Sequence, residues 1–246
     1  EKNIEALKGD YRCIAINLPG YGPDYGGDHP FDMAFFAAVV QAYMEALKLE
    51  SVHLVGHSMG GQIAMYTAIH YPEVSKSLTL IAPAGLETFT EQERLWFQAF
   101  YTADFVRSAS DEQIVKNFEL NFYDMPDDAR FMIEDRFWLK KSAYFDAYCE
   151  MIPQSVQGML KQPVLEQLKQ IEIPGLIIYG ANDALIPNRI LHSNLTIEAV
   201  AKQGLEAYPN SQLKMIEQAG HFVHWEQATQ VNLELQTFLD EVHSEK

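Results

Sequence analysis

The segment GHSMGG (56–61) places Ser58 between two glycines, one two residues before it and one two residues after it. A hydrophobic run precedes this segment and a helical pattern follows it, so the serine would stand on a turn between a strand and a helix. Glycines at both positions are expected to leave room for a very tight turn, which lifts the serine hydroxyl above the sheet. The pattern predicts that Ser58 is a catalytic nucleophile.

A helix that begins directly after Ser58 would direct its amino-terminal N–H groups at the reaction centre. Such groups stabilise the negative charge that develops on a carbonyl oxygen under nucleophilic attack. The backbone N–H of Met59 is therefore the predicted oxyanion donor.

A serine at its ordinary pKa is a weak nucleophile, so it needs a base within reach. His221 directly follows the predicted strand 212–218, where a base could approach the serine. His224 is its nearest rival, and His57 is expected to point away from the Ser58 hydroxyl. His53 is expected to be a satisfied histidine within a strand. The remaining histidines have no motif context and are predicted to lie at the surface: His29, His70, His192 and His243.

The base in turn needs a carboxylate that holds its ring in the right tautomer and stabilises its charged form. Asp183 follows the hydrophobic run 174–180, which precedes the strand of the base along the chain. An aspartate in a loop also commonly serves only to form a turn. Its place at the end of a predicted strand favours Asp183 as the third member of a catalytic triad.

These residues lie on an alternating pattern of strands and helices, which is typical of a parallel sheet with helices on its faces. The fold class predicted is α/β, with a mostly parallel sheet. Strands are predicted at 11–17, 51–56, 75–83, 174–180 and 212–218. Helices are predicted at 2–9, 31–48, 59–70 and 226–242. The stretch 188–211 is longer than a link between two strands requires, and no pattern explains the excess.

The alternation stops between residues 86 and 161, where the sequence contains only helical segments and many aromatic residues. Thr90 with Glu93, and Ser110 with Gln113, have the spacing of helix capping boxes. The chain is therefore predicted to be a sheet domain, 1–85 and 166–246, interrupted by a helical cap at 86–165.

The formal net charge is −16, so a nucleic acid would be repelled, and no cluster of lysine and arginine offsets this field. No run of 18 apolar residues predicts a membrane span. Cys13 and Cys149 are not expected to pair, and two thiols fit a cytoplasmic location. His53 and His57 lie four residues apart, but on a strand and a turn, so no metal site is predicted.

Four segments together resemble the α/β-hydrolase fold superfamily, specifically its capped esterase, lipase and carbon–carbon hydrolase branch. They are LPGYG (18–22), GHSMGG (56–61), YGANDALIP (179–187) and AGHFVHWEQ (219–227). The order nucleophile, acid, base matches that of the family. The resemblance implies the fold, the cap, and hydrolysis through an acyl-enzyme that needs no cofactor.

The chain departs from the family at two places. Asn17 stands where many members carry aspartate before LPGYG, at a structural position. Family members also have strands before the first helix seen here, and one of them ends in a His-Gly turn that supplies a second oxyanion donor. That strand lies between those predicted at 11–17 and 51–56, and without it buried backbone groups would be unpaired. Because the sheet needs this strand, the natural protein is expected to be longer by about 40–60 residues at its N-terminus; the alternative is that a separate polypeptide supplies the strand.

The leading functional hypothesis is a carboxylic ester hydrolase acting on a small molecule with an apolar or aromatic group. Related enzymes that open epoxides or remove halides carry an aspartate at the position of Ser58, on the turn between strand and helix. A serine at this position argues for acyl chemistry. A carbon–carbon hydrolase of ring-cleavage dienoates is the main alternative. Such an enzyme would need an arginine for its acidic substrate, and Arg94, Arg107, Arg130 and Arg136 are available.

Two further hypotheses fall outside hydrolysis. A ligand receptor could retain the triad without turnover. A dinucleotide site at Gly20 and Gly22 is disfavoured, because Pro19 precedes these glycines and no helix begins directly after them.

Overall fold

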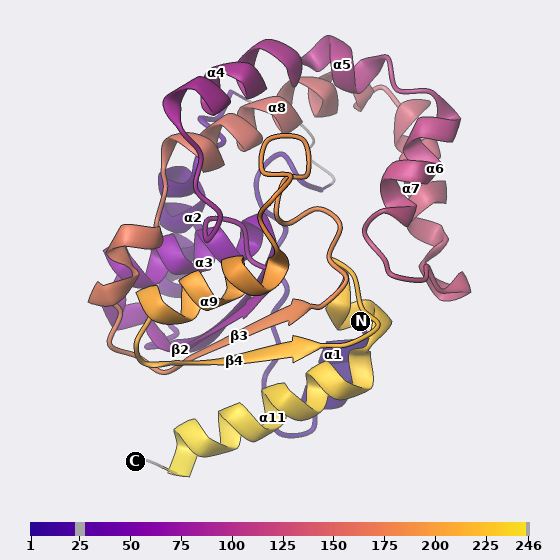
Figure 1. The fold of residues 1–246 in the computed structure, drawn as a ribbon. Coiled ribbons are helices and arrows are strands. Elements are labelled where there is room, and N and C mark those ends of the chain that lie inside the picture. The colour runs from indigo at the N-terminus through magenta and orange to yellow at the C-terminus, as the bar shows by residue number, and fades with distance from the viewer. Residues whose placement is uncertain (23–27, 245–246) are drawn as a thin grey trace.

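Four parallel strands form one sheet in the order β1-β2-β3-β4 in the computed structural model, which describes residues 1–22 and 28–244 (Figure 1). The strands are β1 (Val52–His57), β2 (Ser75–Ile81), β3 (Gly175–Gly180) and β4 (Ser211–Ile216). The four corresponding predictions are confirmed. Because each strand runs parallel to its neighbour, all four carboxyl ends lie at the same edge of the sheet.

The strand predicted at 11–17 is wrong. Residues 12–17 have no regular secondary structure, and the side chain of Ile14 is exposed rather than buried. An extended segment becomes a strand only when a neighbour supplies partners for its N–H and C=O groups. Among the described residues, β1 pairs only with β2, so segment 11–17 receives no such partners.

Helices α2, α3 and α9 flank one face of the sheet, and α1 and α11 flank the other (Figure 1). Their bounds are α1 (Lys2–Leu7), α2 (Met33–Ala46), α3 (Met59–His70), α9 (Ile197–Ala207), α10 (Val223–Glu226) and α11 (Ala228–Ser244). Short 3₁₀ helices are η1 (Pro72–Val74), η2 (Asp127–Ala129) and η3 (Leu165–Gln170). The predicted helices are confirmed. Helix α9 also accounts for the unexplained length of 188–211.

Alternate residues of the strands enter two separate hydrophobic cores. Leu78, Leu80 and Ile177 pack with α3, η3 and α9. Leu176 and Ile178 pack on the opposite face with α1 and α11. A parallel sheet buried on both faces favours such continuous apolar strands. The sheet is therefore a rigid base for the loops at its carboxyl edge.

Five α-helices lie between β2 and β3, and this fully described stretch contains no strand, as predicted. They are α4 (Glu91–Phe100), α5 (Ala103–Arg107), α6 (Asp111–Glu119), α7 (Phe131–Lys140) and α8 (Phe145–Lys161). Both predicted capping boxes are present, at the starts of α4 and α6. Figure 1 shows α4, α5 and α8 above α2, α3 and α9, on the far side of these helices from the sheet, with α6 and α7 to one side.

Helix α8 is joined to α2 and α3 by a third hydrophobic cluster. Tyr148, Cys149 and Met151 of α8 pack with Phe36 of α2 and Ile63 of α3. Burying such side chains favours the contact by roughly 1.5–3 kcal/mol each. The division into a sheet domain and a cap at 86–165 remains a prediction.

Candidate active site

Ser58 stands on a strained turn directly after β1 and immediately before α3. Its backbone has φ 53° and ψ −121°, which is costly for a residue with a side chain. The Ser58 N–H donates to the Ile81 carbonyl at 3.0 Å, and the Ser58 carbonyl accepts from the N–H of Ala84 at 3.0 Å. The end of β2 therefore holds the turn in place.

The two glycines that flank Ser58 in the sequence differ in how much space a side chain would have at their positions. A Cβ on Gly56 would lie 2.2 Å from the carbonyl oxygen of Gly60, so no side chain fits at position 56. A Cβ on Gly60 would meet nothing within 4 Å. The expectation that both positions lack room is thus wrong at Gly60. The crowded position after the serine is Gly61, whose Cβ would lie 2.7 Å from that of Pro83.

Asp183 and His221 are brought together as predicted from the ends of β3 and β4. Nδ1 of His221 lies 2.8 Å from Oδ2 of Asp183, and both side chains are buried. The other carboxylate oxygen accepts the N–H groups of Leu185 at 2.8 Å and Ile186 at 3.0 Å. These donors fix the direction of the carboxylate and offset the cost of burying it.

His57, set aside in the sequence, contacts the backbone of the predicted base. Its Nε2 lies 2.9 Å from the carbonyl oxygen of His221, and its ring lies 4.4 Å from the ring of His224. Burial, together with the neighbouring histidines, holds the pKa of His57 well below its usual value. Burial likewise lowers the pKa of His224 to about 4. The signal in the sequence was the position of His57 at the carboxyl end of a strand, directly before the proposed nucleophile.

Met59 is the first residue of α3, so its N–H has no acceptor within the helix. The side chain of Met59 lies 3.8 Å from the Tyr21 hydroxyl, which comes from the LPGYG segment. Burial raises the pKa of Tyr21 to about 12, so this phenol is protonated at neutral pH.

The four arginines considered for an acidic substrate differ in their partners. Arg94 pairs with Glu91, Arg130 with Asp127, and Arg107 with three carboxylates. Arg136 has no carboxylate partner within the part of the chain that the structure describes.

Arg136 instead lies over the ring of Tyr148, 4.2 Å from its centroid, and 5.8 Å from that of Phe118. Burial raises the pKa of Tyr148 and of Tyr101, and the charge of Arg136 opposes both shifts. Tyr21 and Met59 pack against the hydrophobic cluster that contains Tyr148. The ring under Arg136 therefore belongs to a cluster that extends to the turn of Ser58.

His192, predicted at the surface, is half-buried between two carboxylates. Its Nδ1 contacts Oε1 of Glu87 and its Nε2 lies 3.1 Å from Oε1 of Glu93. His29 is also half-buried and stacks on Phe35, whereas His70 and His243 are exposed as predicted. The tertiary contacts of the loop after β3, which no local pattern encodes, decide the environment of His192.

The other predictions concern thiols, His53 and metals. Cys13 and Cys149 are both free. Nδ1 of His53 lies 2.7 Å from the Ser77 hydroxyl, as expected of a satisfied histidine. No group of three or more metal-binding side chains with suitable geometry occurs among residues 1–22 and 28–244. Within the same residues, no helix has both the length and the apolarity of a membrane span.

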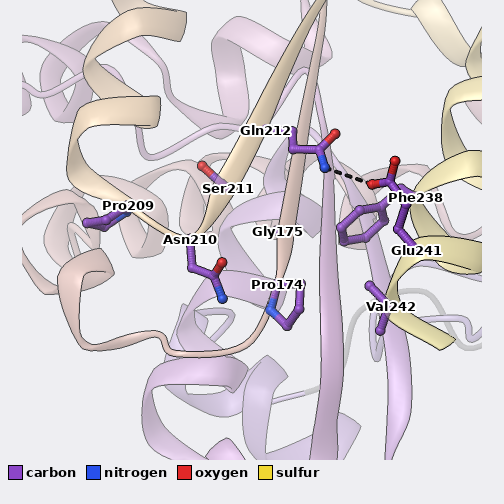
Figure 2. A pocket seen from close by; sticks show the side chains of 9 residues that line it. All are labelled: Pro174, Gly175, Pro209, Asn210, Ser211, Gln212, Phe238, Glu241 and Val242. Atoms are coloured by element: carbon purple, nitrogen blue, oxygen red, sulfur yellow. Dashed lines mark hydrogen bonds between the residues drawn. The ribbon is translucent and has the colours of Figure 1, made fainter. Parts of the chain in front are cut away.

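Figure 2 shows a pocket at the opposite edge of the sheet, near the amino ends of β3 and β4. Pro174, Gly175 and Ser211 line it beside Phe238 of α11. The amide of Gln212 donates to the Glu241 carboxylate at 2.9 Å across it. The pocket contains none of Ser58, Asp183 and His221, so it is separate from the candidate active site.

Curated relatives cover nearly the whole chain. A dihydrolipoyllysine-residue acetyltransferase component of the acetoin cleaving system from Pseudomonas putida is 29% identical over 240 residues, which are 96% of this chain and 58% of that protein. The chain thus spans under two thirds of that relative. A 2-hydroxy-6-oxononadienedioate/2-hydroxy-6-oxononatrienedioate hydrolase from a Pseudomonas species is 24% identical over 241 residues, 97% of this chain and 81% of that protein.

Solved structures share the fold. A probable hydrolytic enzyme from Pseudomonas aeruginosa PAO1 has a TM-score of 0.85 at 20% identity, covering 97% of this chain and 80% of that one. A meta-cleavage product hydrolase from Pseudomonas fluorescens IP01 has a TM-score of 0.76 at 22% identity, covering 98% and 84%. The family model described as alpha/beta hydrolase fold matches residues 1–228. With this match and the parallel sheet, the chain belongs to the alpha/beta hydrolase fold family.

Proposed function

We propose that the chain is a serine hydrolase in which Ser58, His221 and Asp183 form the catalytic triad. The hydrogen bond from His221 Nδ1 to Asp183 Oδ2 carries the proposal. It leaves Nε2 of the same ring as the site that accepts the Ser58 proton during attack on a carbonyl carbon. The strained backbone of Ser58 supports the role of nucleophile, since such strain is concentrated at functional sites.

The simplest substrate is a carboxylic ester. Ser58 Oγ bonds to the carbonyl carbon, and the alcohol leaves with the proton that His221 accepted. Water then attacks the carbonyl carbon of the acyl-enzyme while His221 accepts a proton from it, and His221 passes that proton to Ser58 Oγ as the carboxylic acid leaves. In the proposal the N–H of Met59 stabilises the oxyanion in both steps. No step needs a metal or an organic cofactor.

The proposed cap, 86–165, would cover this site. Its aromatic side chains support an apolar or aromatic group on the substrate, because such rings favour contact with apolar surfaces. Tyr101 and Tyr148 are among them.

A second candidate is carbon–carbon hydrolysis of a dienoate acid, and Arg136 favours it. A guanidinium pairs readily with a carboxylate, and Arg136 has no such partner among the described residues. Relatives named as hydrolases of 2-hydroxy-6-oxononadienedioate act on an anionic compound. In this candidate the substrate carboxylate would pair with Arg136 while Ser58 and His221 cleave the bond beside a ketone.

Labelling with a fluorophosphonate tests the triad. The probe reacts covalently with an activated serine, so the wild-type protein should be labelled and Ser58→Ala should not. Turnover of p-nitrophenyl acetate should disappear in the same variant. Wild-type protein that remains unlabelled while correctly folded would contradict the proposal and favour a ligand receptor.

Replacing Arg136 separates the two substrate classes. In Arg136→Met we expect kcat/KM for a dienoate acid to fall about 100-fold, the size of a lost charge-assisted hydrogen bond of about 3 kcal/mol. Hydrolysis of a neutral p-nitrophenyl ester should change little. Arg130→Met is the matched control, since Arg130 already pairs with Asp127 at the surface. Equal losses for both substrates would count against an anionic substrate.

A further inference from the structure

The carboxylate of Glu226, five residues after the proposed base, accepts three backbone N–H groups. Oε2 accepts from Gly220 at 2.8 Å and from Tyr123 at 3.1 Å. Oε1 accepts from Asp124 at 2.6 Å. One of these donors directly precedes His221, and the other two belong to the helical stretch between β2 and β3.

The segments that Glu226 joins also touch each other. The N–H of Phe222 donates to the carbonyl of Asn121 at 2.9 Å. The rings of Phe122 and Phe222 stack at 5.2 Å with an angle of 14° between them. A Cβ on Gly220 would lie 2.7 Å from the backbone carbonyl carbon of Phe122, so the two chains meet backbone to backbone. His221 is therefore held between two residues in contact with segment 121–124.

Three N–H donors require an acceptor-only group. An ionised carboxylate offers two oxygens and about four lone-pair sites, and it carries the charge that strengthens each bond. A glutamine amide of the same length offers one oxygen, and its NH₂ group would face an N–H donor. Glutamine at position 226 therefore leaves at least one backbone donor of this junction unpaired.

We infer that Glu226 is a positioning residue, which fixes the proposed base and makes segment 121–124 and His221 move as one unit. The inference rests on the proposed triad. Glu226 touches no reacting atom in it, and its effect passes through the backbone of Gly220 to the ring of His221. A displacement of that ring by about 1 Å is enough to cost on the order of 100-fold in rate.

The test compares Glu226→Gln with Glu217→Gln, a matched change at an exposed glutamate nearby. We expect kcat for p-nitrophenyl acetate to fall at least 10-fold in Glu226→Gln, with KM changed less than 2-fold. Amide hydrogen exchange should accelerate in both 121–124 and 220–222. Glu217→Gln should match the wild type in all three measurements.

A double-mutant cycle separates positioning from general stability. If Glu226 acts by orienting His221, the loss caused by Glu226→Gln should shrink to less than 2-fold in an Asp183→Asn background. A loss of equal size in both backgrounds, or a kcat that falls only in proportion to the folded fraction, would overturn the inference. If Glu226→Gln does not fold, the same measurements are made on Glu226→Asp. The shorter side chain cannot bring its carboxylate to both 121–124 and 220–222, so the same loss of kcat is expected. Absence of fluorophosphonate labelling in the wild type would instead count against the triad itself.

Discussion

Nε2 of His57 lies 2.9 Å from the carbonyl oxygen of His221, so the residue before the proposed nucleophile holds the backbone of the proposed base. A carbonyl only accepts, so Nε2 of His57 carries a hydrogen. The ring of His224 packs 4.4 Å from that of His57, and its Nδ1 is buried without a hydrogen-bond partner among the described residues. The turn of Ser58 and the loop of His221 are therefore connected by uncharged imidazoles.

This arrangement predicts that stability falls in mild acid. The pKa values of His57 and His224 are depressed in the folded protein, the latter to about 4, so both rings are neutral there. In the unfolded chain they bind protons below about pH 6.5. The unfolded state thus gains protons first, and the free energy of unfolding should decrease as pH falls from 6.5 towards 4.

Urea unfolding at pH 7.5, 6.0 and 5.0 measures this loss, with a slope of about 1.4 kcal/mol per pH unit for each proton. His224→Phe should reduce this slope, because the unfolded chain then has one imidazole fewer to protonate. His70→Gln, at an exposed histidine, should leave it unchanged. An identical slope in His224→Phe and the wild type would show that His224 does not titrate as its burial requires.

Asp183→Asn should lower kcat on the order of 10⁴-fold without unfolding the protein, because an amide cannot hold the imidazole in the required tautomer. The two N–H donors of the loop would still find an oxygen acceptor. Steady-state kinetics with p-nitrophenyl acetate, beside circular dichroism, checks both parts. Asp240→Asn on the surface of α11 is the control. A loss smaller than 10-fold would remove Asp183 from the triad.

Gly56→Ala and Gly60→Ala should have opposite effects. A methyl group at position 56 would overlap the carbonyl of Gly60, so we expect a loss of about 1–3 kcal/mol or more in the free energy of unfolding. At position 60, within α3, alanine meets open space and should stabilise the helix by about 0.5–1 kcal/mol. Urea unfolding of the two variants measures both signs. Equal destabilisation would contradict the geometry of the turn.

Glu87→Ala should destabilise the protein by about 1–3 kcal/mol, because it leaves a backbone donor without its acceptor. Glu87 accepts the N–H of Asn188 at 2.8 Å and contacts His192, and burial raises its pKa. Chemical denaturation gives the difference. Glu206→Ala removes only an exposed pair with Lys202 and should change stability by less than about 0.5 kcal/mol. If the two variants lose the same amount, the buried contact of Glu87 is not important for stability.

The sequence by itself determined the features that local patterns encode. Apolar periodicity located the four strands of the sheet, and Thr90 and Ser110 marked the starts of two helices. The segment around Ser58 predicted a strand, a strained turn and a helix in that order. In each case the deciding interactions join residues a few positions apart, so neighbouring residue types suffice to predict them.

Apart from the pair of Asp183 and His221, which the sequence predicted, only the tertiary structure decided which distant groups meet. Segment 11–17 has the composition of a strand, yet it receives no pairing partner among the described residues. His192 lies between Glu87 and Glu93, and Glu226 reaches Tyr123, more than 90 positions away in each case. Strand pairing, burial and hydrogen bonds of this kind depend on how remote segments pack. A residue's own neighbours in the chain carry no information about that packing, so these contacts emerge only once the whole chain has folded.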